Sequence, residues 1–143
     1  MRRELSAGAV LVRRFHRRWW IAVTRPQGRP PDYWVLPKGL MHEGERSLET
    51  AVRETYEETG VRGTGDRLVG ESRYVYTWDG ERVFKIVRFF LLRAASGRIG
   101  KLPPGMEVEV AEARWLPLEE ARRALAHGGE REIVAKAAAM LDL

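Results

Sequence analysis

The sequence predicts a mixed α/β or α+β domain, because runs patterned as strands alternate along the chain with runs patterned as helices. Its 143 residues are the length of one ordinary domain, and 44% of them are hydrophobic, which is enough for a core. These values exclude a disordered chain and a disulfide-stabilised miniprotein. The absence of cysteine also excludes thiolate metal sites and cysteine nucleophiles. We therefore expect a single domain over residues 1–143.

The first part of the chain has the pattern of a hairpin followed by turns. Short apolar runs at 5–12 and 19–23 predict two strands joined by a polar turn. Three prolines and a glycine between 25 and 31 cannot continue a sheet, so a turn is expected there. Residues 34–36 are expected to be briefly extended and residues 39–44 to form a loop.

Residues 47–59 carry the clearest helical pattern. Inward-facing side chains recur at i, i+3, i+4 and i+7, namely Leu48, Ala51, Val52 and Thr55. Ser47 is expected as the N-cap, and Gly60 is expected to end the helix.

A second hairpin is predicted after this helix. Residues 68–78 and 83–92 have the pattern of strands, and the Asp-Gly pair at 79–80 is a strong signal for a tight turn between them. A loop rich in glycine and proline is expected over 97–106, followed by a last short strand at 113–116.

The C-terminal part is expected to hold two helices. Pro117 is suited to open the first of them, which is expected to run through Ala126. The pair Gly128-Gly129 is expected to break this helix, and residues 133–141 are expected to form an amphipathic helix that closes the chain.

Charge is distributed unevenly along the chain. The 25 Lys and Arg residues outnumber the 20 Asp and Glu residues, and nine of the basic residues lie within 1–38. Residues 43–60 reverse this bias, with six glutamates against two arginines. Such a chain could bind polyanions broadly, nucleic acid included, or could hold one phosphate-rich ligand between cations and a carboxylate-bound metal.

Three glutamates crowd one side of the predicted helix. Glu54, Glu57 and Glu58 lie at i, i+3 and i+4, where like charges repel one another. Arg53 is placed to offset part of this repulsion by pairing with Glu49 and Glu57. One interpretation is a merely solvated helix face. The other is a cluster of hard oxygen donors, which Mg²⁺ or Mn²⁺ would neutralise.

The spacing around these glutamates resembles the signature of the Nudix hydrolases, G-x5-E-x7-R-E-U-x-E-E-x-G-U, where U is a bulky aliphatic residue. Residues 39–61, called the box below, match all seven fixed letters: Gly39, Glu45, Arg53, Glu54, Glu57, Glu58 and Gly60. Thr55 departs from the pattern at a position that is usually aliphatic. The segments SAGAVLV, WVLPKG and EARWLPLEEA also resemble the family, so that the likeness covers most of the chain.

The resemblance implies a mixed β-sheet sandwiched between α-helices, an α/β/α sandwich. It implies hydrolysis of a nucleoside diphosphate linked to another group, in which water attacks a bridging phosphorus with the help of Mg²⁺ or Mn²⁺. The metal ligands implied are Glu54, Glu57, Glu58 and the carbonyl of Gly39. Arg53 and Glu45 would form an ion pair that orients these ligands. Gly60 would be needed as a glycine if the backbone there takes a positive φ or lies close to the metal.

The general base is not fixed by the box, since family members use different glutamates, some of them from a late loop. This chain offers Glu107, Glu109 and Glu112 before Trp115. We favour Glu109. The alternative is that all three glutamates simply solvate a turn.

The substrate class is suggested by a few residues outside the conserved letters. Lys38 directly before the box resembles the diadenosine polyphosphate and diphosphoinositol polyphosphate hydrolases, whereas RNA pyrophosphohydrolases tend to have glutamine there. Tyr76 could stack on adenine, although a core tyrosine is an equal alternative. Lys85 and Arg88 lie on opposite faces of a strand, and the resemblance selects Lys85 for phosphate binding. Arg25 is a further phosphate candidate.

These residues favour hydrolysis of diadenosine tetra- to hexaphosphates (Ap4A–Ap6A). The alternatives are a MutT-like pyrophosphohydrolase of oxidised nucleoside triphosphates, a diphosphoinositol polyphosphate phosphohydrolase, and a Nudix-fold sensor that binds a nucleotide without cleaving it. Because every box carboxylate is present, catalysis is favoured over sensing.

The expected setting follows from composition. No apolar run approaches the roughly 20 residues of a membrane span, and the N-terminus lacks the apolar stretch of a secretory signal. We expect a cytoplasmic protein, monomeric or homodimeric, with a nucleotide substrate and no membrane or stable nucleic-acid partner.

Overall fold

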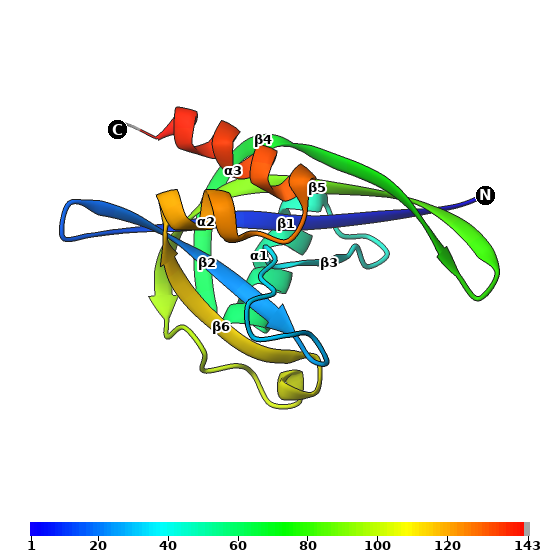
Figure 1. The fold of residues 1–143 in the computed structure, drawn as a ribbon, viewed down its shortest axis with the longest axis horizontal. Coiled ribbons are helices and arrows are strands. Elements are labelled where there is room, and N and C mark those ends of the chain that lie inside the picture. The colour runs from blue at the N-terminus through cyan, green and yellow to red at the C-terminus, as the bar shows by residue number, and fades with distance from the viewer. Residues whose placement is uncertain (142–143) are drawn as a thin grey trace.

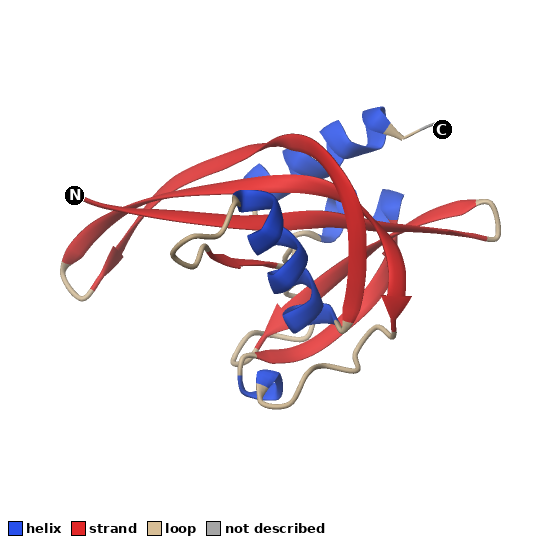
Figure 2. Ribbon diagram, turned by 180° about the vertical axis from the view of Figure 1, so that it is seen from behind, coloured by secondary structure: helices blue, strands red, loops and turns tan. Residues whose placement is uncertain are grey.

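The computed structural model describes residues 1–141 as one six-stranded sheet with helices on both faces (Figures 1 and 2). The last two residues of the expected domain, 142–143, lie outside the described residues. The strands are β1 (Arg2–Phe15), β2 (Arg18–Pro26), β3 (Lys38–Leu40), β4 (Val61–Trp78), β5 (Glu81–Gly97) and β6 (Val110–Pro117). The helices are α1 (Ser47–Thr59), α2 (Leu118–Ala124) and α3 (Gly128–Met140), with a 3₁₀ turn η1 (Met106–Val108) before β6.

The sheet is mixed and runs in the order β4-β5-β1-β2-β6, with β3 paired to β1. β1 runs parallel to β5, and the other strand pairs are antiparallel. The two predicted hairpins are confirmed, although their strands are longer than the apolar runs that predicted them. Because β4 and β5 are long, the end of their hairpin projects well beyond the helices (Figure 1).

Two hydrophobic cores cover the two faces of the sheet. On one face, α1 packs Ala51 against small and branched residues of β1, β2 and β5, including Ala9, Leu11 and Leu92. On the other face, α2 and α3 cover a larger core built around Phe89. The two views show α1 alone on one side and α2 with α3 on the other (Figures 1 and 2). The expected α/β/α sandwich is thus confirmed.

Residues 38–40 differ from the expectation of a loop beginning at Gly39. They form β3, which places Lys38 opposite Gly8 and Gly39 opposite Ala7 of β1. The close approach depends on Gly8, because a Cβ there would overlap the carbonyl oxygen of Pro37. Sequence periodicity misses a strand of three residues, since its pairing comes from a distant segment.

Helix α1 has the predicted length but a different N-terminus. Its N-cap is Arg46, and Ser47 is already helical. Glu49 is therefore the third helical residue and accepts the Arg46 backbone N–H at 2.8 Å, as in a capping box. The expected pairing of Glu49 with Arg53 is wrong for this reason. At the other end Gly60 takes a left-handed conformation with φ 82°, as a helix-terminating glycine does.

The C-terminal helices also differ from expectation. The first of them, α2, already ends at Ala124, and Gly128 and Gly129 are not a helix break but form the first turn of α3. Glycine fits there because a Cβ at Gly129 would come within 2.7 Å of the Ser72 hydroxyl on β4. None of the helices within residues 1–141 is both long enough and apolar enough to cross a membrane.

Candidate functional site

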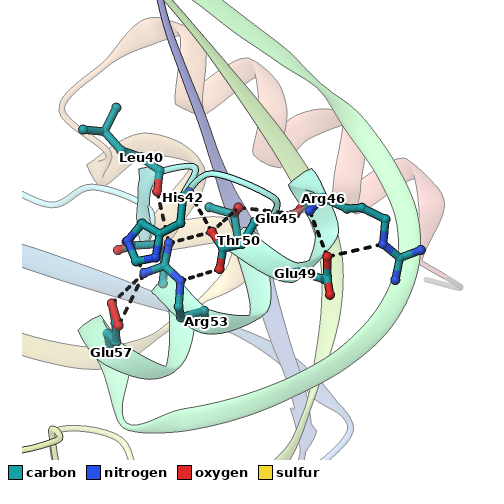
Figure 3. Close-up of polar contacts among 9 residues, drawn as sticks. Leu40, His42, Glu45, Arg46, Glu49, Thr50, Arg53 and Glu57 are labelled. Atoms are coloured by element: carbon teal, nitrogen blue, oxygen red, sulfur yellow. Dashed lines mark hydrogen bonds and ion pairs between the residues drawn. The ribbon is translucent and has the colours of Figure 1, made fainter.

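The loop between β3 and α1 is held closed by Glu45 (Figure 3). Its Oε1 accepts the backbone N–H of His42 at 2.8 Å and the hydroxyl of Thr50 at 2.9 Å. Because Thr50 lies fully buried in the first turn of α1, these bonds tie the loop to the helix. Glu45 therefore fixes the backbone of the box loop, in addition to forming an ion pair with Arg53.

Arg53 lies at the centre of the box carboxylates (Figure 3). Its Nε and Nη2 donate to the two oxygens of Glu45 at 2.7 and 3.0 Å, a bidentate geometry. Its Nη1 donates to Glu54 at 2.8 Å and to Glu57 at 3.0 Å, and Nη2 also donates to the carbonyl of Leu40 at 3.1 Å. One guanidinium thus orients three carboxylates, and its hydrogen bonds lower the pKa of Glu45 to about 2.

Glu54 and Glu58 lie deeper in the site than Glu57. The Glu54 side chain is 13% exposed, against 31% for Glu57. The pKa of the Glu58 carboxyl is raised to about 8, mainly by burial and to a smaller extent by the charges of Glu54 and Glu109, against the opposing charge and backbone N–H of Lys38. Burial likewise raises the pKa of Glu54. Glu58 Oε1 accepts the backbone N–H of Lys38 at 3.2 Å, which joins α1 to β3.

These carboxylates suit a hard divalent cation in their chemistry, because they are clustered oxygen donors and partial burial raises the pKa of both Glu54 and Glu58. Gly39 lies directly against them, since a Cβ there would overlap the Glu54 carboxyl group. In the conformation of residues 1–141, no three His, Asp or Glu side chains are arranged so that they could bind one metal ion. Arg53 Nη1 bonds both Glu54 and Glu57, so a shared cation requires Glu57 to rotate away from the guanidinium.

Lys38 is held by a glutamate that the sequence did not single out. Its Nζ lies 2.8 Å from Oε2 of Glu130 and donates to the carbonyl of Leu36 at 2.8 Å. Glu130 is 4% exposed, and its Oε1 accepts the Leu36 backbone N–H at 2.8 Å. No local sequence signal could have revealed the role of Glu130, because it lies 94 residues after Leu36 in the chain.

A cavity of about 320 Å³ adjoins Lys38 and Glu130. It opens between β4, β5 and the start of α3, and its lining includes Tyr74, Phe89 and His127. Tyr74 is half-buried, and burial raises its pKa to about 12. Its neighbour Tyr76, which the sequence favoured for base stacking, is outside the lining and donates its hydroxyl to Glu4.

The side chains of Lys85 and Arg88 lie on opposite faces of β5, as the alternation predicted. Lys85 shares its face with Val87 and Phe89; burial lowers its pKa, and the opposing charges of Glu4, Glu58 and Glu54 show that it is near the box. Arg88 shares the other face with Phe90 and Leu92 and donates to Glu71 at 3.2 Å. Lys85 is therefore the β5 cation within electrostatic reach of the box.

The late loop around η1 separates its three glutamates. Glu107 accepts the backbone N–H of Gly105 at 3.1 Å. Glu112 pairs with Arg25 at 3.5 Å and with Arg114 at 3.3 Å, so the guanidinium of Arg25 is already engaged. Glu109 caps the C-terminal end of η1 and is exposed, and its charge acts on both Glu54 and Glu58.

The chain is similar in sequence to a known domain family and to several known proteins. The NUDIX domain family matches residues 2–137. A mutator protein of Mycobacterium tuberculosis (strain CDC 1551 / Oshkosh), MutT4, is 38% identical over 109 residues, which cover 76% of this chain and 42% of MutT4. The asymmetrical bis(5′-nucleosyl)-tetraphosphatase of Mus musculus is 31% identical over 93 residues, 62% of this chain and 58% of that enzyme.

A solved structure gives the same fold. The C. elegans Ap4A hydrolase, in a binary complex, superposes with a TM-score of 0.71 and 22% identity over 96% of both chains. This chain spans less than two thirds of the length of either curated relative. The family match nevertheless covers nearly all of its described residues and includes the whole box. The resemblance seen in the sequence is therefore confirmed, and the chain belongs to the NUDIX domain family.

Proposed function

We propose that this chain is a divalent-metal-dependent hydrolase of nucleoside diphosphate-linked compounds. Members of its family generally use divalent metals. The observation that carries the proposal is the buried carboxylate of Glu58, whose pKa is raised to about 8 beside the further negative charges of Glu54 and Glu109. Such a concentration of charge costs folding energy unless a cation shares it, so it indicates function rather than stability.

Glu54, Glu57, Glu58 and the Gly39 carbonyl are the proposed ligands of Mg²⁺ or Mn²⁺. When bound, the ion would withdraw charge from the phosphate oxygens and lower the pKa of water. Arg53 holds the carboxylates in place, and Glu57, the more exposed of them, would turn from Arg53 toward the ion.

The remaining roles belong to groups around the box. We assign to Glu109 the removal of a proton from the attacking water, because it is exposed and acts electrostatically on both buried glutamates. Lys85 would bind a phosphate oxygen from the β5 side. Lys38 would do so from β3, which requires its ammonium to exchange Glu130 for the phosphate. Arg25, engaged by Glu112, is the weakest of these candidates.

The favoured substrates are diadenosine polyphosphates, Ap4A to Ap6A. Lys38 before the box and the mouse tetraphosphatase relative support this class. The cavity of about 320 Å³ beside Lys38 is large enough for a nucleobase and offers Tyr74 and Phe89 as aromatic walls. Tyr74 therefore joins Tyr76 as a candidate for the base contact.

A second candidate is the hydrolysis of oxidised nucleoside triphosphates, as the name of the MutT-type relative suggests. The identity of 38% with MutT4 is the specific observation in its favour. A nucleoside triphosphate would use the same cations and the same cavity, so the two candidates differ only in measured specificity.

The catalytic role is tested with Glu57→Gln and Glu58→Gln in a Mg²⁺-dependent assay of product release. Each variant should remain folded and lose turnover by orders of magnitude, because the amide carries no charge to hold the ion. Glu49→Gln is the matched control on the same helix and should turn over like the wild type, since its amide oxygen preserves the capping bond. Unchanged turnover in both test variants would remove the metal role from these residues.

The substrate class is tested by comparing kcat/KM across a panel. The panel contains Ap4A, Ap5A, Ap6A, 8-oxo-dGTP, ADP-ribose, a diphosphoinositol polyphosphate and a triphosphorylated RNA. The highest kcat/KM is expected for a dinucleoside polyphosphate. A clear preference for 8-oxo-dGTP would select the second candidate, and binding without turnover of every compound would identify a sensor.

A further inference from the structure

The tip of the β1–β2 hairpin is basic and aromatic, and it lies away from the box. Residues 13–18 read Arg-Arg-Phe-His-Arg-Arg, with the tight turn made by His16 and Arg17 at positive φ. Figure 1 shows this hairpin projecting from the body at the side opposite the N-terminus. Phe15 is 49% exposed, although a large apolar side chain at a hairpin tip gains nothing for the fold.

Strand pairing brings further aromatic side chains to the same face. Arg13 pairs with Trp20 across the hairpin, and Phe15 lies two residues beyond Arg13, so all three face the same side. Trp115 joins them from β6, because its partner Ala22 lies two residues from Trp20. Three aromatic rings and a guanidinium from three strands thus share one surface.

These side chains enclose a groove. A cavity of about 250 Å³ is lined by Arg13, Phe15, Trp20 and Trp115. A second cavity of about 460 Å³ shares Arg13 and Trp115 with the first and continues along residues 94–99. We call the two together the hairpin groove. No carboxylate of the box lines either cavity.

The charge of the hairpin groove is entirely positive. Its lining contains Arg13 and Arg98 and no acidic residue. The guanidinium of Arg13 lies 5.1 Å from the Phe15 ring, and that of Arg18 lies 5.4 Å from the Trp20 ring. At the tip, residues 13–18, Arg18 pairs with Glu119 at 3.2 Å.

The second face of the hairpin continues the positive charge. Arg14 and Arg93 both stack on Trp19, at 5.3 and 4.9 Å from its ring. Guanidinium groups therefore flank both faces of the hairpin, where they can attract the phosphates of a bound strand.

We propose that the hairpin groove binds single-stranded nucleic acid. Aromatic walls stack on unpaired bases regardless of sequence, and arginines neutralise the phosphates between them. The smaller cavity, about 250 Å³ in volume and lined by three aromatic side chains and Arg13, is suited to a planar base more than to a sugar or a free phosphate. This replaces the expectation from the sequence of no stable nucleic-acid partner, and it is independent of the hydrolase proposal.

The test is fluorescence anisotropy of a labelled 12-nucleotide oligouridylate, titrated with the full chain at low and at moderate salt. Binding should weaken with salt, as phosphate contacts do. Phe15→Ala and Arg13→Ala should each weaken it by about tenfold or more, since each removes a stacking or phosphate contact. Arg122→Ala, an exposed arginine on α2, is the control and should bind within about twofold of the wild type.

Two further measurements keep the result unambiguous. The melting temperature of each variant establishes that it is folded, and its kcat/KM on the best mononucleotide or dinucleotide substrate should equal that of the wild type. The proposal is overturned if oligouridylate does not bind at low salt, or if Phe15→Ala and Arg13→Ala bind it like Arg122→Ala. It is also overturned if a blunt duplex of the same length binds equally well, which would indicate charge alone.

Discussion

Oε2 of Glu130 lies 2.8 Å from the ammonium of Lys38, and the same carboxylate accepts the backbone N–H of Leu36. A nearly buried side chain at the start of α3 thereby fixes the backbone that leads into Gly39 and the box. The lysine that the sequence assigned to the substrate is, in this structure, first of all a partner of Glu130. If Lys38 has the role proposed above, a substrate phosphate would compete with Glu130 for its ammonium group.

Removing the charge of Glu130 should destabilise the fold through Lys38. We expect Glu130→Gln to lower the free energy of unfolding by about 1–3 kcal/mol, the range for a lost charge-assisted hydrogen bond in a mostly buried setting. Glu132→Gln, on the exposed side of the same helix, should change it little. Urea denaturation measures both, and a double-mutant cycle with Lys38→Met should give clear coupling. Additive effects within about 0.5 kcal/mol would show that the two side chains do not interact.

The ion pair of Glu45 and Arg53 should make stability fall at acid pH. The hydrogen bonds from Arg53 lower the folded-state pKa of Glu45 from 4.5 to about 2. Below pH 4.5 the unfolded chain binds the proton first, so the contribution of this carboxylate is complete above 4.5 and is lost as the pH falls toward 2.

Calorimetric melting temperatures between pH 2 and 6 measure this contribution. In Glu45→Gln the decline should be shallower than in the wild type, because the amide does not titrate. Parallel curves for the two proteins would rule out Glu45 as a source of the acid sensitivity.

Thr55 offers a stabilising substitution. This residue stands where the family signature has an aliphatic side chain, and it is fully buried with a hydroxyl that has no hydrogen-bond partner among residues 1–141. Thr55→Val keeps the shape and removes the unpaired polar atom, so we expect about 1–2 kcal/mol of added stability. Thermal and urea unfolding measure the change, with Thr50→Val expected to destabilise because that hydroxyl donates to Glu45. A loss of stability in Thr55→Val would mean that the hydroxyl is satisfied in solution.

The opposed orientation of Lys85 and Arg88 gives a matched pair of variants for substrate binding. Lys85→Met should lower kcat/KM for the best substrate by about tenfold or more, the worth of one charge-assisted phosphate contact. Arg88→Met should leave kcat/KM unchanged, because that guanidinium is already engaged by Glu71 of β4. Steady-state kinetics at constant ionic strength compare the two. Equal losses in both variants would point to net charge instead of a contact.

Much of the fold follows from local patterns. The helical spacing of Glu54, Glu57 and Glu58 and the glycine after Thr59 are local properties of the chain, and they predict α1 and its acidic side without any knowledge of tertiary contacts. The β4–β5 turn is equally local, being set by an Asp-Gly pair. These features were predictable because their causes lie within a few residues.

The features that the sequence left open depend on long-range contacts. Strand β3 exists because Gly8 admits the backbone of Pro37, and α3 begins at Gly128 because its first turn packs against Ser72. The partner of Lys38 comes from a helix 92 residues further along the chain. Sequence periodicity carries no information about such pairs. The box was therefore visible in the sequence, whereas the surroundings of Lys38, the proposed phosphate-binding lysine before it, were not.

The central claim is that the carboxylates of Glu54, Glu57 and Glu58 converge on a divalent ion beside a polyphosphate. Anomalous scattering from Mn²⁺, in crystals grown with a non-hydrolysable Ap4A analogue, locates the ion directly. We predict a peak bonded to these carboxylates and to the Gly39 carbonyl, in contact with the phosphate chain. A peak elsewhere with the analogue bound around it, and none at the box, would contradict the account.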